Sequence, residues 1–346
     1  MTKIRSAFFA ALFTFSIISA QTGTFTNPLL PSGPDPFVIF HDGFYYYMNT
    51  TARNLTIWKT RSMSDLKNAE KKIVWTPPAE GPYSRDIWAP ELHLIKGKWY
   101  IYFAADAGTN QTHRLWVIEN SSPDPLTGTW STPHKLADST DKWAIDGSAF
   151  ENKGQLYLIW SGWEGDENGT QSIFIARLKN PWTIQDPRVR ISTPQYPWEK
   201  VGDTPGDGML HVDVNEGPEV LKHGNRLFLI YSASGCWTDY YTLGEAIASV
   251  DSNLLDPRSW KKVPHPVFSE SPEAHAYGTG HNGFFKSPDG KQDWIIYHAN
   301  PEPHQGCGRL RSPRAQPFTW KTDGTPDFGK PIPLDQPILR PSGEAQ

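Results

Sequence analysis

The chain has few cysteines, no excess of basic residues and, after its first twenty positions, no apolar run that could cross a membrane. Two cysteines in 346 residues exclude a small fold built on disulfides. A formal net charge of −4 at pH 7 provides no basic surface to offset phosphate repulsion, which argues against nucleic acids and anionic membranes as partners. Long helical patterns are also missing, because 31 prolines and 28 glycines divide the chain into short segments.

What the chain does contain is a large apolar and aromatic fraction. Hydrophobic residues make up 38% of it and aromatic residues 13%, including 15 tryptophans. This composition predicts a folded globular protein with a sizeable core, and short aromatic-rich segments favour β-structure.

The first twenty residues differ from the rest. Two basic residues precede an apolar run over residues 7–18, and Ala20 ends the segment before a polar stretch. This order predicts a secretory signal peptide over residues 1–20, because about a dozen apolar residues are too few for the alternative, an N-terminal membrane anchor. We therefore expect a secreted, extracellular protein whose mature chain, residues 21–346, is a single catalytic domain without membrane contact.

Export bears on the cysteines and on glycosylation. In an oxidising compartment Cys236 and Cys307 are expected to form one disulfide, with two free buried thiols as the alternative. The chain also has five Asn-x-Ser/Thr sequons, which are compatible with a glycoprotein although such short motifs also arise by chance. They begin at Asn49, Asn54, Asn110, Asn120 and Asn168.

One pattern recurs five times along the mature chain. Each copy has an apolar residue, a turn and an aromatic-rich strand, as is typical of a β-hairpin. The turn glycines are Gly43, Gly97, Gly154, Gly224 and Gly290. About 65 residues per copy can hold a four-stranded sheet with loops, so the repeat predicts an all-β, five-bladed β-propeller with its active site at one end of the central axis. The alternative, a two-sheet sandwich, would not need the same hairpin five times.

Residues at a constant interval before each turn glycine should converge on the propeller axis. Eight positions before the glycine stand Asp35, Ala89, Asp146 and Glu216, and His281 stands nine positions before the glycine of the longer fifth turn. Carboxylates gathered in a partly desolvated channel raise one another's pKa values, so stability alone does not favour them. The shared register therefore indicates catalysis.

Each of these residues also has a plain structural interpretation when it is considered alone. Asp35 lies in a Pro-Asp-Pro loop, and Asp146 could form an Asp-Gly turn. Glu216 could be a solvated loop acid, with Glu219 as the buried one. A lone histidine such as His281 is more often a core residue or a hydrogen-bond donor than a metal ligand.

At these positions the sequence resembles glycoside hydrolase family 43, propeller hydrolases that act on arabinose- and xylose-containing polysaccharides. The resemblance covers nearly the whole mature chain and is carried by the motifs GPDPF, IWAPEL, AIDGSAF, EGPEV, GTGHNGFF and RSPRAQPFTWKTDGTPDFG. It implies an inverting hydrolysis in which Asp35 is the general base and Glu216 the general acid. Asp146 would raise the pKa of Glu216 through its negative charge and orient the reacting groups.

The resemblance also implies substrate contacts and an optional ion. Trp88 would cover a sugar ring, with a core position as its alternative. Arg311 resembles the family's arginine near the acids, with a solvent-exposed arginine as its alternative. His281 would contact the substrate or help to hold a calcium or sodium ion on the axis through water. No cofactor is expected to be required, because the sequence has no dense cluster of oxygen ligands.

The substrate is suggested by two further segments. SASGCWTDYYTLG and GTGHNGFFKSPDG are most similar to the exo-acting α-L-arabinofuranosidase branch, so the expected substrate is α-1,5-linked arabinan or its oligosaccharides. An endo-α-1,5-L-arabinanase or a β-xylosidase of the same family is the alternative. A non-catalytic sugar-binding propeller is less favoured, because it would not need all three acids.

Overall fold

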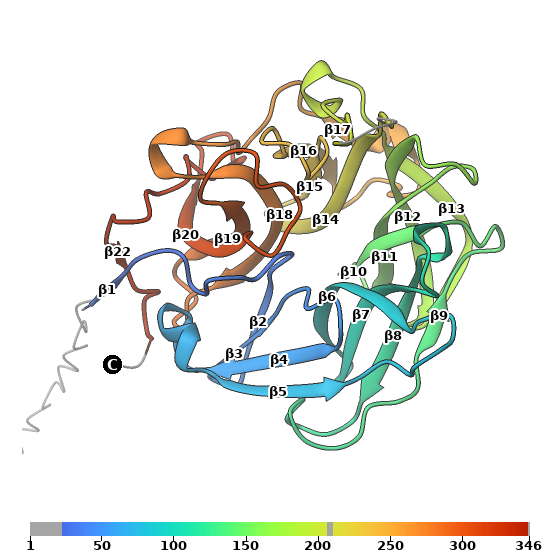
Figure 1. The fold of residues 1–346 in the computed structure, drawn as a ribbon, viewed down its shortest axis with the longest axis horizontal. Coiled ribbons are helices and arrows are strands. Elements are labelled where there is room, and N and C mark those ends of the chain that lie inside the picture. The colour runs from blue at the N-terminus through green and yellow to red at the C-terminus, as the bar shows by residue number, and fades with distance from the viewer. Residues whose placement is uncertain (1–22, 206–209, 345–346) are drawn as a thin grey trace, which may run out of the picture.

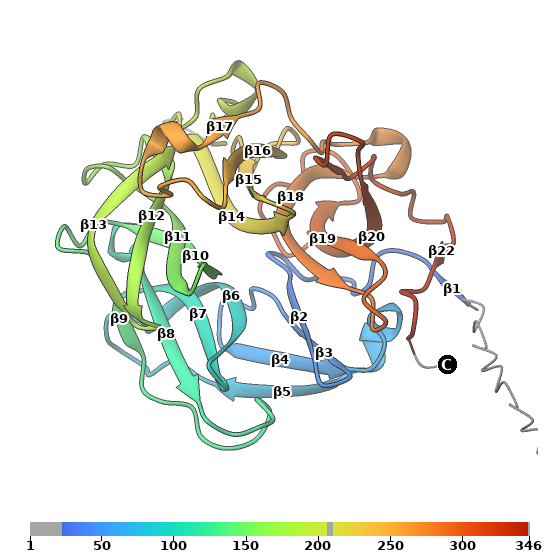
Figure 2. The ribbon, with the colours of Figure 1, turned by 180° about the vertical axis from the view of Figure 1, so that it is seen from behind.

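The computed structural model describes residues 23–205 and 210–344, so the signal peptide expected over residues 1–20 lies outside the described residues. In the described part of the chain, twenty strands form five antiparallel four-stranded blades, which stand around a central axis (Figure 1). A short parallel pairing of Thr170 and Gln171 with Asp213 and Val214 joins the third and fourth blades into one sheet. Within each sheet the first strand lies nearest the axis, and the view from behind shows the same ring (Figure 2). The five-bladed β-propeller predicted from the repeat is confirmed.

Each blade takes four strands in chain order. The strands of the first three blades are β2 (Phe37–His41), β3 (Phe44–Met48), β4 (Leu55–Thr60), β5 (Glu70–Trp75), β6 (Arg85–Ile95), β7 (Lys98–Asp106), β8 (Arg114–Asn120), β9 (His134–Leu136), β10 (Ala144–Asn152), β11 (Gln155–Gly162), β12 (Thr170–Asn180) and β13 (Thr183–Ser192). Those of the last two are β14 (Asp213–His223), β15 (Arg226–Ala233), β16 (Thr242–Ser249), β17 (Lys261–Lys262), β18 (Tyr277–Lys286), β19 (Asp293–Asn300), β20 (Ser312–Trp320) and β21 (Pro326–Asp327).

The helices of the described residues are short 3-10 segments between strands. They are η1 (Met63–Asn68), η2 (Asn110–Thr112), η3 (Pro197–Glu199), η4 (Pro257–Ser259) and η5 (Pro272–Ala274). None of them is long or apolar enough to cross a membrane.

The inner hairpins form because their turns have the required backbone conformation. In blade one the turn residues Asp42 and Gly43 have φ angles of 49° and 76°, and Lys153 and Gly154 in blade three have 51° and 77°. Two successive left-handed residues match the right-handed twist of the flanking strands, and glycine adopts this conformation without steric cost.

The hydrophobic core is divided into five parts, each between two neighbouring blades. Successive residues of one strand point to opposite faces of the sheet, so each blade contributes to two of these parts. In β11, for example, Leu158 and Trp160 pack toward blade two, whereas Tyr157 and Ile159 pack toward blade four. The ring of blades is therefore held together by apolar burial on both faces of every sheet.

The two ends of the described chain meet beside blade five. The short strand β1 (Thr24–Phe25) pairs with β22 (Ile338–Leu339). The buried amide of Asn27 bonds both backbone groups of Ala315 in β20, at 3.1 Å to the carbonyl oxygen and 2.9 Å from the N–H group. These contacts attach the N-terminal segment to the last blade.

The inner strands of blades two to five are each interrupted by a β-bulge near one end of the axis. A bulge re-aims side chains and is common beside active sites. A residue with left-handed backbone occupies each bulge, and blade one has one just before β2. These residues are Asp35, Ala89, Asp146, Gly217 and His281.

The register counted from the turn glycines is wrong by one residue in blade four. Gly217, and not Glu216, occupies the position of Asp146, while Glu216 is the last paired residue before the bulge, as Ile145 is in blade three. The reason lies in the turn, because Gly224 is the first residue of the two-residue turn in blade four and glycine is the second in blades one to three. Counting eight positions back from Gly224 therefore ends at Glu216, one residue before the equivalent position, Gly217.

Candidate active site

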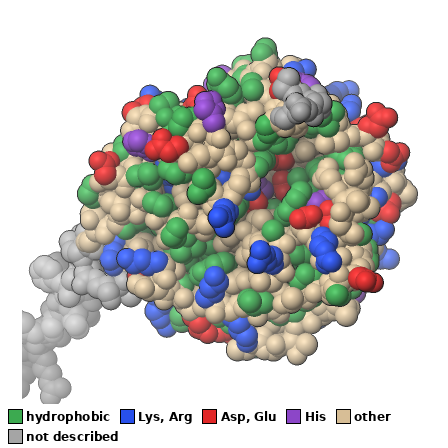
Figure 3. Space-filling model, viewed as in Figure 1, with side chains coloured by type: hydrophobic (Ala, Val, Ile, Leu, Met, Phe, Trp, Pro, Cys, Tyr) green, Lys and Arg blue, Asp and Glu red, His purple; other side chains and the backbone are tan. Residues whose placement is uncertain are grey.

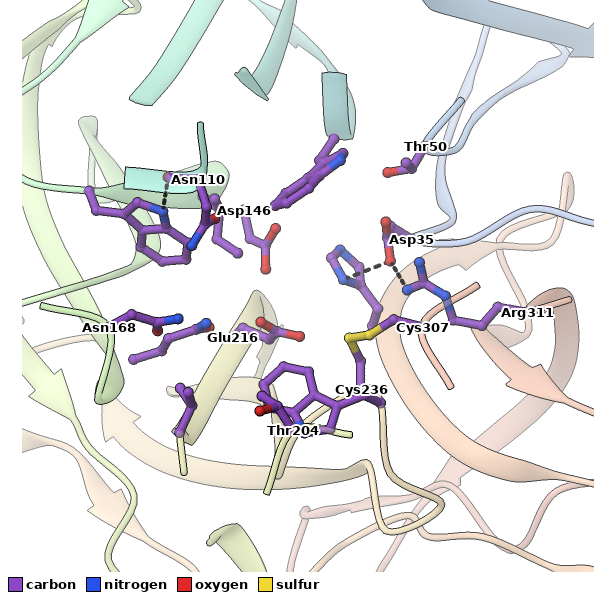
Figure 4. A pocket seen from close by; sticks show the side chains of 17 residues that line it. Asp35, Thr50, Asn110, Asp146, Asn168, Thr204, Glu216, Cys236, Cys307 and Arg311 are labelled. Carbon is purple, nitrogen blue, oxygen red and sulfur yellow. Dashed lines mark hydrogen bonds and ion pairs between the residues drawn. A yellow bond between two sulfur atoms is a disulfide. The ribbon is translucent and has the colours of Figure 1, made fainter. Parts of the chain in front are cut away.

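A cavity of about 330 Å³ opens where the five bulged ends meet. Figure 3 shows the molecule hollowed near its centre, with acidic and histidine side chains inside the hollow. Every blade contributes to the lining, which consists of Asp35, Thr50, Trp88, Asn110, Trp143, Ile145, Asp146, Asn168, Gln171, Thr204, Val212, Glu216, Cys236, Trp237, His281, Cys307 and Arg311. All six residues that the sequence singled out for catalysis or substrate binding thus line one cavity (Figure 4).

Asp35 is held in its left-handed conformation, with φ of 55°, by a hydrogen bond from its backbone N–H to Nδ1 of His298 at 3.1 Å. Its Oδ1 accepts a hydrogen bond from Nη1 of Arg311 at 2.9 Å and lies 3.4 Å from Nδ1 of His281. Non-glycine residues in this conformation cost free energy that the surroundings must offset, and such strain is concentrated at functional sites.

The carboxyl group of Asp35 is kept ionised by its partners. Burial alone would raise its pKa, but Arg311, His281 and His298, together with a hydrogen bond from Thr50, lower the pKa below its ordinary value. Burial lowers the pKa values of both histidines, so they are neutral near pH 7. Arg311 is therefore the permanent charge that keeps Asp35 a carboxylate.

The pKa of Glu216 is shifted in the opposite direction, upward. This residue is only 8% exposed, so it is not a solvated loop acid, and burial raises its pKa to about 7 despite a hydrogen bond to its Oε1 from the hydroxyl of Tyr241 at 2.9 Å. The like charge that raises the pKa of Glu216 further is that of Asp35. A carboxyl with this pKa is protonated in a large fraction of molecules at neutral pH.

The charge state of Asp146 differs in part from what the sequence predicts. Burial raises its pKa well above the ordinary value, and Glu216 and Asp35 raise it further, so Asp146 is not simply the negative neighbour that was expected to shift Glu216. The two carboxyls form a coupled pair whose titration steps belong to both groups. Oδ2 of Asp146 also accepts a 2.9 Å hydrogen bond from the backbone N–H of Gly217, which places it in contact with the residue that follows Glu216.

The remaining two predicted side chains also lie at the cavity. Trp88 is half-buried, and its ring stacks on that of His113 with the centroids 4.1 Å apart and an angle of 27° between the planes. One face of the Trp88 ring is thus covered by His113, while the residue also lines the cavity. Arg311 is not a solvent-exposed arginine, because 11% of its side chain is accessible and it is paired with Asp35.

Comparison with known proteins agrees with this geometry. Residues 25–326 match the family model described as glycosyl hydrolases family 43. The chain belongs to this family. The match runs from β1 to the start of β21 and therefore includes residues of all five blades.

Several family 43 relatives are similar along most of the chain. An "extracellular exo-alpha-(1->5)-L-arabinofuranosidase" from Streptomyces avermitilis is 38% identical over 317 residues, which are 89% of this chain and 64% of the relative. An alpha-L-arabinofuranosidase 43 from Humicola insolens is 36% identical over 96% of this chain and 69% of its own length. The crystal structure of an alpha-L-arabinofuranosidase from Lactobacillus brevis aligns with a TM-score of 0.82 at 35% identity, covering 90% of this chain and 98% of that one. The chain therefore spans about two thirds of the length of the first two relatives.

The optional calcium or sodium ion, which the resemblance implies would be held by His281 through water, has no set of direct side-chain ligands in the described residues. Among them, no group of three or more histidine, cysteine, aspartate or glutamate side chains is arranged to hold a metal. Nδ1 of His281 faces Asp35, whose Oδ1 is already paired with Arg311. These residues do not fit an ion that is coordinated directly by protein side chains at this position.

The two cysteines are bonded to each other, with their Cα atoms 5.2 Å apart, and the disulfide forms part of the cavity wall. Two sequon asparagines, Asn110 and Asn168, line the same cavity. At two other sequons, the side chains of Asn49 and Asn120 are buried and donate hydrogen bonds to backbone carbonyl oxygens.

Sequence reasoning missed several functional side chains. His298 contacts Asp35 from the end of β19, and Tyr241 contacts Glu216 from the residue before β16. Tyr241 lies within SASGCWTDYYTLG, a segment that the sequence marks only through its resemblance to the arabinofuranosidase branch. Trp143 and Trp237 add aromatic surface to the cavity, and Trp143 directly precedes the AIDGSAF motif. None of these four shares the repeat register that identified the acids.

Proposed function

We propose that the protein is a secreted, inverting exo-α-L-arabinofuranosidase that releases L-arabinose from α-1,5-linked arabinan and its oligosaccharides. The observation that carries this proposal is the opposite protonation of two carboxyls facing one cavity. Asp35 is ionised beside Arg311, whereas the pKa of Glu216 is about 7. A base and an acid with separated pKa values are what inverting hydrolysis requires.

In the proposed reaction Asp35 acts as the general base. Its carboxylate removes a proton from a water molecule as the water oxygen attacks the anomeric carbon of the arabinofuranosyl unit. Glu216 donates its proton to the glycosidic oxygen as the bond to the anomeric carbon breaks, so the leaving sugar departs as a neutral alcohol. Water enters opposite the leaving group and the configuration is inverted. In inverting enzymes the two carboxyls are roughly 6.5–9.5 Å apart to leave room for the water.

Asp146 is assigned a positioning role in this scheme. Its hydrogen bond to the N–H group of Gly217 holds the backbone that carries Glu216, and its coupled titration with Glu216 helps to retain a proton on the pair. Trp88, Trp143 and Trp237 supply aromatic faces of the kind that pack against sugar rings. The histidine of blade five, His281, packs against Asp35 and completes the wall beside the base.

Exo action and arabinose selectivity are supported by the names of the relatives and by the size of the cavity. About 330 Å³ suits one or two sugar units better than a long polymer segment. The Streptomyces relatives are named exo-acting and extracellular. Secretion is further supported by the disulfide, which persists in oxidising compartments. We also retain cleavage after Ala20 and a single catalytic domain over residues 21–346 as part of the proposal.

The proposed function is tested by product analysis. The purified protein is incubated with linear α-1,5-arabinan, and products are separated by anion-exchange chromatography at early times. Arabinose as the sole early product is expected. A ladder of oligosaccharides would identify an endo-arabinanase, and release from an aryl β-xyloside but not from an aryl α-arabinofuranoside would identify a xylosidase. Glu216→Gln is the matched control, because it keeps the shape of the side chain while it removes the acid.

A further inference from the structure

Two loops at the cavity each carry the partner of one catalytic carboxyl. The loop over residues 234–241, between β15 and β16, ends in Tyr241, which donates a hydrogen bond to Glu216. The loop over residues 301–311, between β19 and β20, ends in Arg311, which pairs with Asp35. The disulfide joins these two loops.

The two loops differ in how firmly the rest of the fold holds them. Tyr241 is 1% exposed, and its ring stacks parallel to that of His298 with an angle of 2° between the planes. It packs so closely on Gly280 that no room is left for a β-carbon there. Packing therefore holds Tyr241 in place in addition to its hydrogen bond to Glu216.

Arg311 has weaker support. Most of the residues that precede it, 302–304 and 308–310, are exposed. Its Nε donates to the carbonyl oxygen of Gly308 in the same loop at 3.1 Å, and its own carbonyl oxygen accepts from the N–H group of Gly33 at 3.0 Å. Cys307 stands four residues before Arg311, and Figure 4 shows the disulfide beside the Asp35–Arg311 pair.

We propose that the Cys236–Cys307 disulfide is a positioning element of the hydrolytic site, which holds Arg311 against the general base Asp35. The anchor is the loop of Cys236, which is attached to the packed Tyr241 on one side and, through the N–H group of Gly235, to the carbonyl oxygen of Val201 at 2.8 Å on the other. This inference rests on the proposed function, because it assigns a role in keeping the base ionised.

The physical consequence concerns the protonation of Asp35. The groups that face it are Arg311, the neutral rings of His281 and His298, the hydroxyls of Thr50, Tyr47 and Tyr241, and the carboxyls of Glu216 and Asp146 across the cavity. Without Arg311, burial still raises the pKa of Asp35, and the two histidines and Thr50 alone oppose it. A looser Arg311 should therefore move the acidic limb of the pH profile of kcat/KM to higher pH.

The test replaces both cysteines, as Cys236→Ser with Cys307→Ser, so that no reactive thiol remains. The pH dependence of kcat/KM is measured on an aryl α-L-arabinofuranoside. Loss of an adjacent arginine changes an aspartate pKa by about 1–3 units, so the acidic limb is expected to rise by one pH unit or more. The basic limb reports Glu216, whose pKa is lowered more by the hydrogen bond from Tyr241 than by Arg311. It is expected to rise by less than the acidic limb, because Tyr241 keeps this hydrogen bond.

A double-mutant comparison identifies Arg311 as the intermediary. Arg311→Met alone should raise the acidic limb at least as far as the cysteine variant does. If the disulfide acts through Arg311, removing the cysteines in the Arg311→Met background will produce no further shift. Two shifts that add fully would overturn the proposal, because they would show that the disulfide acts on Asp35 by another route.

A purely structural disulfide makes a different prediction. The cysteine variant would then have a lower melting temperature and an unshifted profile, as expected of the stability control Asn27→Ala, whose amide holds β20 far from the cavity. That result overturns the proposal. If the cysteine variant does not fold, the disulfide of the folded wild-type enzyme is reduced with a phosphine instead. The number of free thiols is measured to confirm reduction, and the acidic limb of the kcat/KM profile is then determined.

Failure of the positioning role and failure of the proposed function give different results. Wild-type enzyme that does not release arabinose from either the aryl substrate or arabinan rejects the function itself. Normal wild-type release, combined with an unshifted acidic limb after loss of the disulfide, rejects only the positioning role.

Discussion

Oδ2 of Asp146 accepts a hydrogen bond from the backbone N–H of Gly217 at 2.9 Å, across the interface between blades three and four. Gly217 directly follows Glu216 and has left-handed backbone, with φ of 53°. The carboxyl group of Asp146 in blade three thereby holds the β-bulge that orients Glu216 in blade four. Asp146 is coupled to Glu216 in two ways, through this contact and through the interaction of their charges.

The first prediction separates these two couplings. In Asp146→Asn the amide oxygen can still accept from Gly217, so the fold is expected to be retained, but the ionisable group is gone. The last proton of the Asp146–Glu216 pair is held against the charge of the other carboxylate, and this repulsion is absent in the variant. The basic limb of the kcat/KM profile should therefore move to lower pH. Turnover near neutral pH should fall accordingly. An unchanged profile with normal turnover would return Asp146 to a purely structural role.

The second prediction concerns the acid. Glu216→Gln should reduce hydrolysis of arabinan by about 10²–10⁴-fold, the usual contribution of general acid catalysis. The loss should be much smaller on a nitrophenyl arabinofuranoside, whose leaving group needs little protonation. Initial rates on the two substrates measure the difference directly. Equal losses on both substrates would contradict the assignment of Glu216 as the acid.

The third prediction concerns Tyr241. Its hydroxyl hydrogen bond stabilises the ionised form of Glu216 and lowers the pKa of that residue. Tyr241→Phe keeps the ring packed on His298, so the change is confined to the hydroxyl. The basic limb should rise by about one to two pH units, because a hydrogen bond to a charged group is worth about 1.5–3 kcal/mol and one pKa unit about 1.4 kcal/mol. If the basic limb of the kcat/KM profile moves to lower pH or does not move, Tyr241 does not set the proton affinity of Glu216.

The fourth prediction concerns stereochemistry. Direct attack by water activated at Asp35 inverts the anomeric centre, so an α-arabinofuranoside should first yield the β-anomer. Proton NMR during the first minutes, before mutarotation equilibrates the product, distinguishes the anomers. Asp35→Asn is the control and should abolish turnover. An initial α-product would require a covalent intermediate and would exclude the single-step mechanism.

Much of the fold was predictable because its signals are local. A hairpin turn is specified by its own residues, so pairs such as Asp42–Gly43 mark the inner hairpin of a blade without reference to the rest of the chain. Five such hairpins at similar spacing predict five blades. The same count placed the acids together at one end of the axis, although it misplaced Glu216 by one residue, because Gly224 opens its turn instead of closing it.

The site beyond the acids could not be read in this way. His298 and Tyr241 reach Asp35 and Glu216 from the second strand of blade five and from a loop of blade four, at positions that no repeat register marks. The pKa of Glu216 likewise depends on how deeply the cavity buries it, and burial is a property of all five blades together.

The sequence by itself determined the hairpins, their number and the identities of the acids, since each depends on neighbouring residues or on a repeated interval. Only the tertiary structure decided which acid is ionised and which is protonated, because these states follow from contacts between residues far apart in the chain. Arg311 and Asp35 are separated by 276 positions, and no local pattern records that they meet. Ring closure brings them together, and at 2.9 Å the guanidinium group, with His281, His298 and Thr50, outweighs the burial that would otherwise protonate the base.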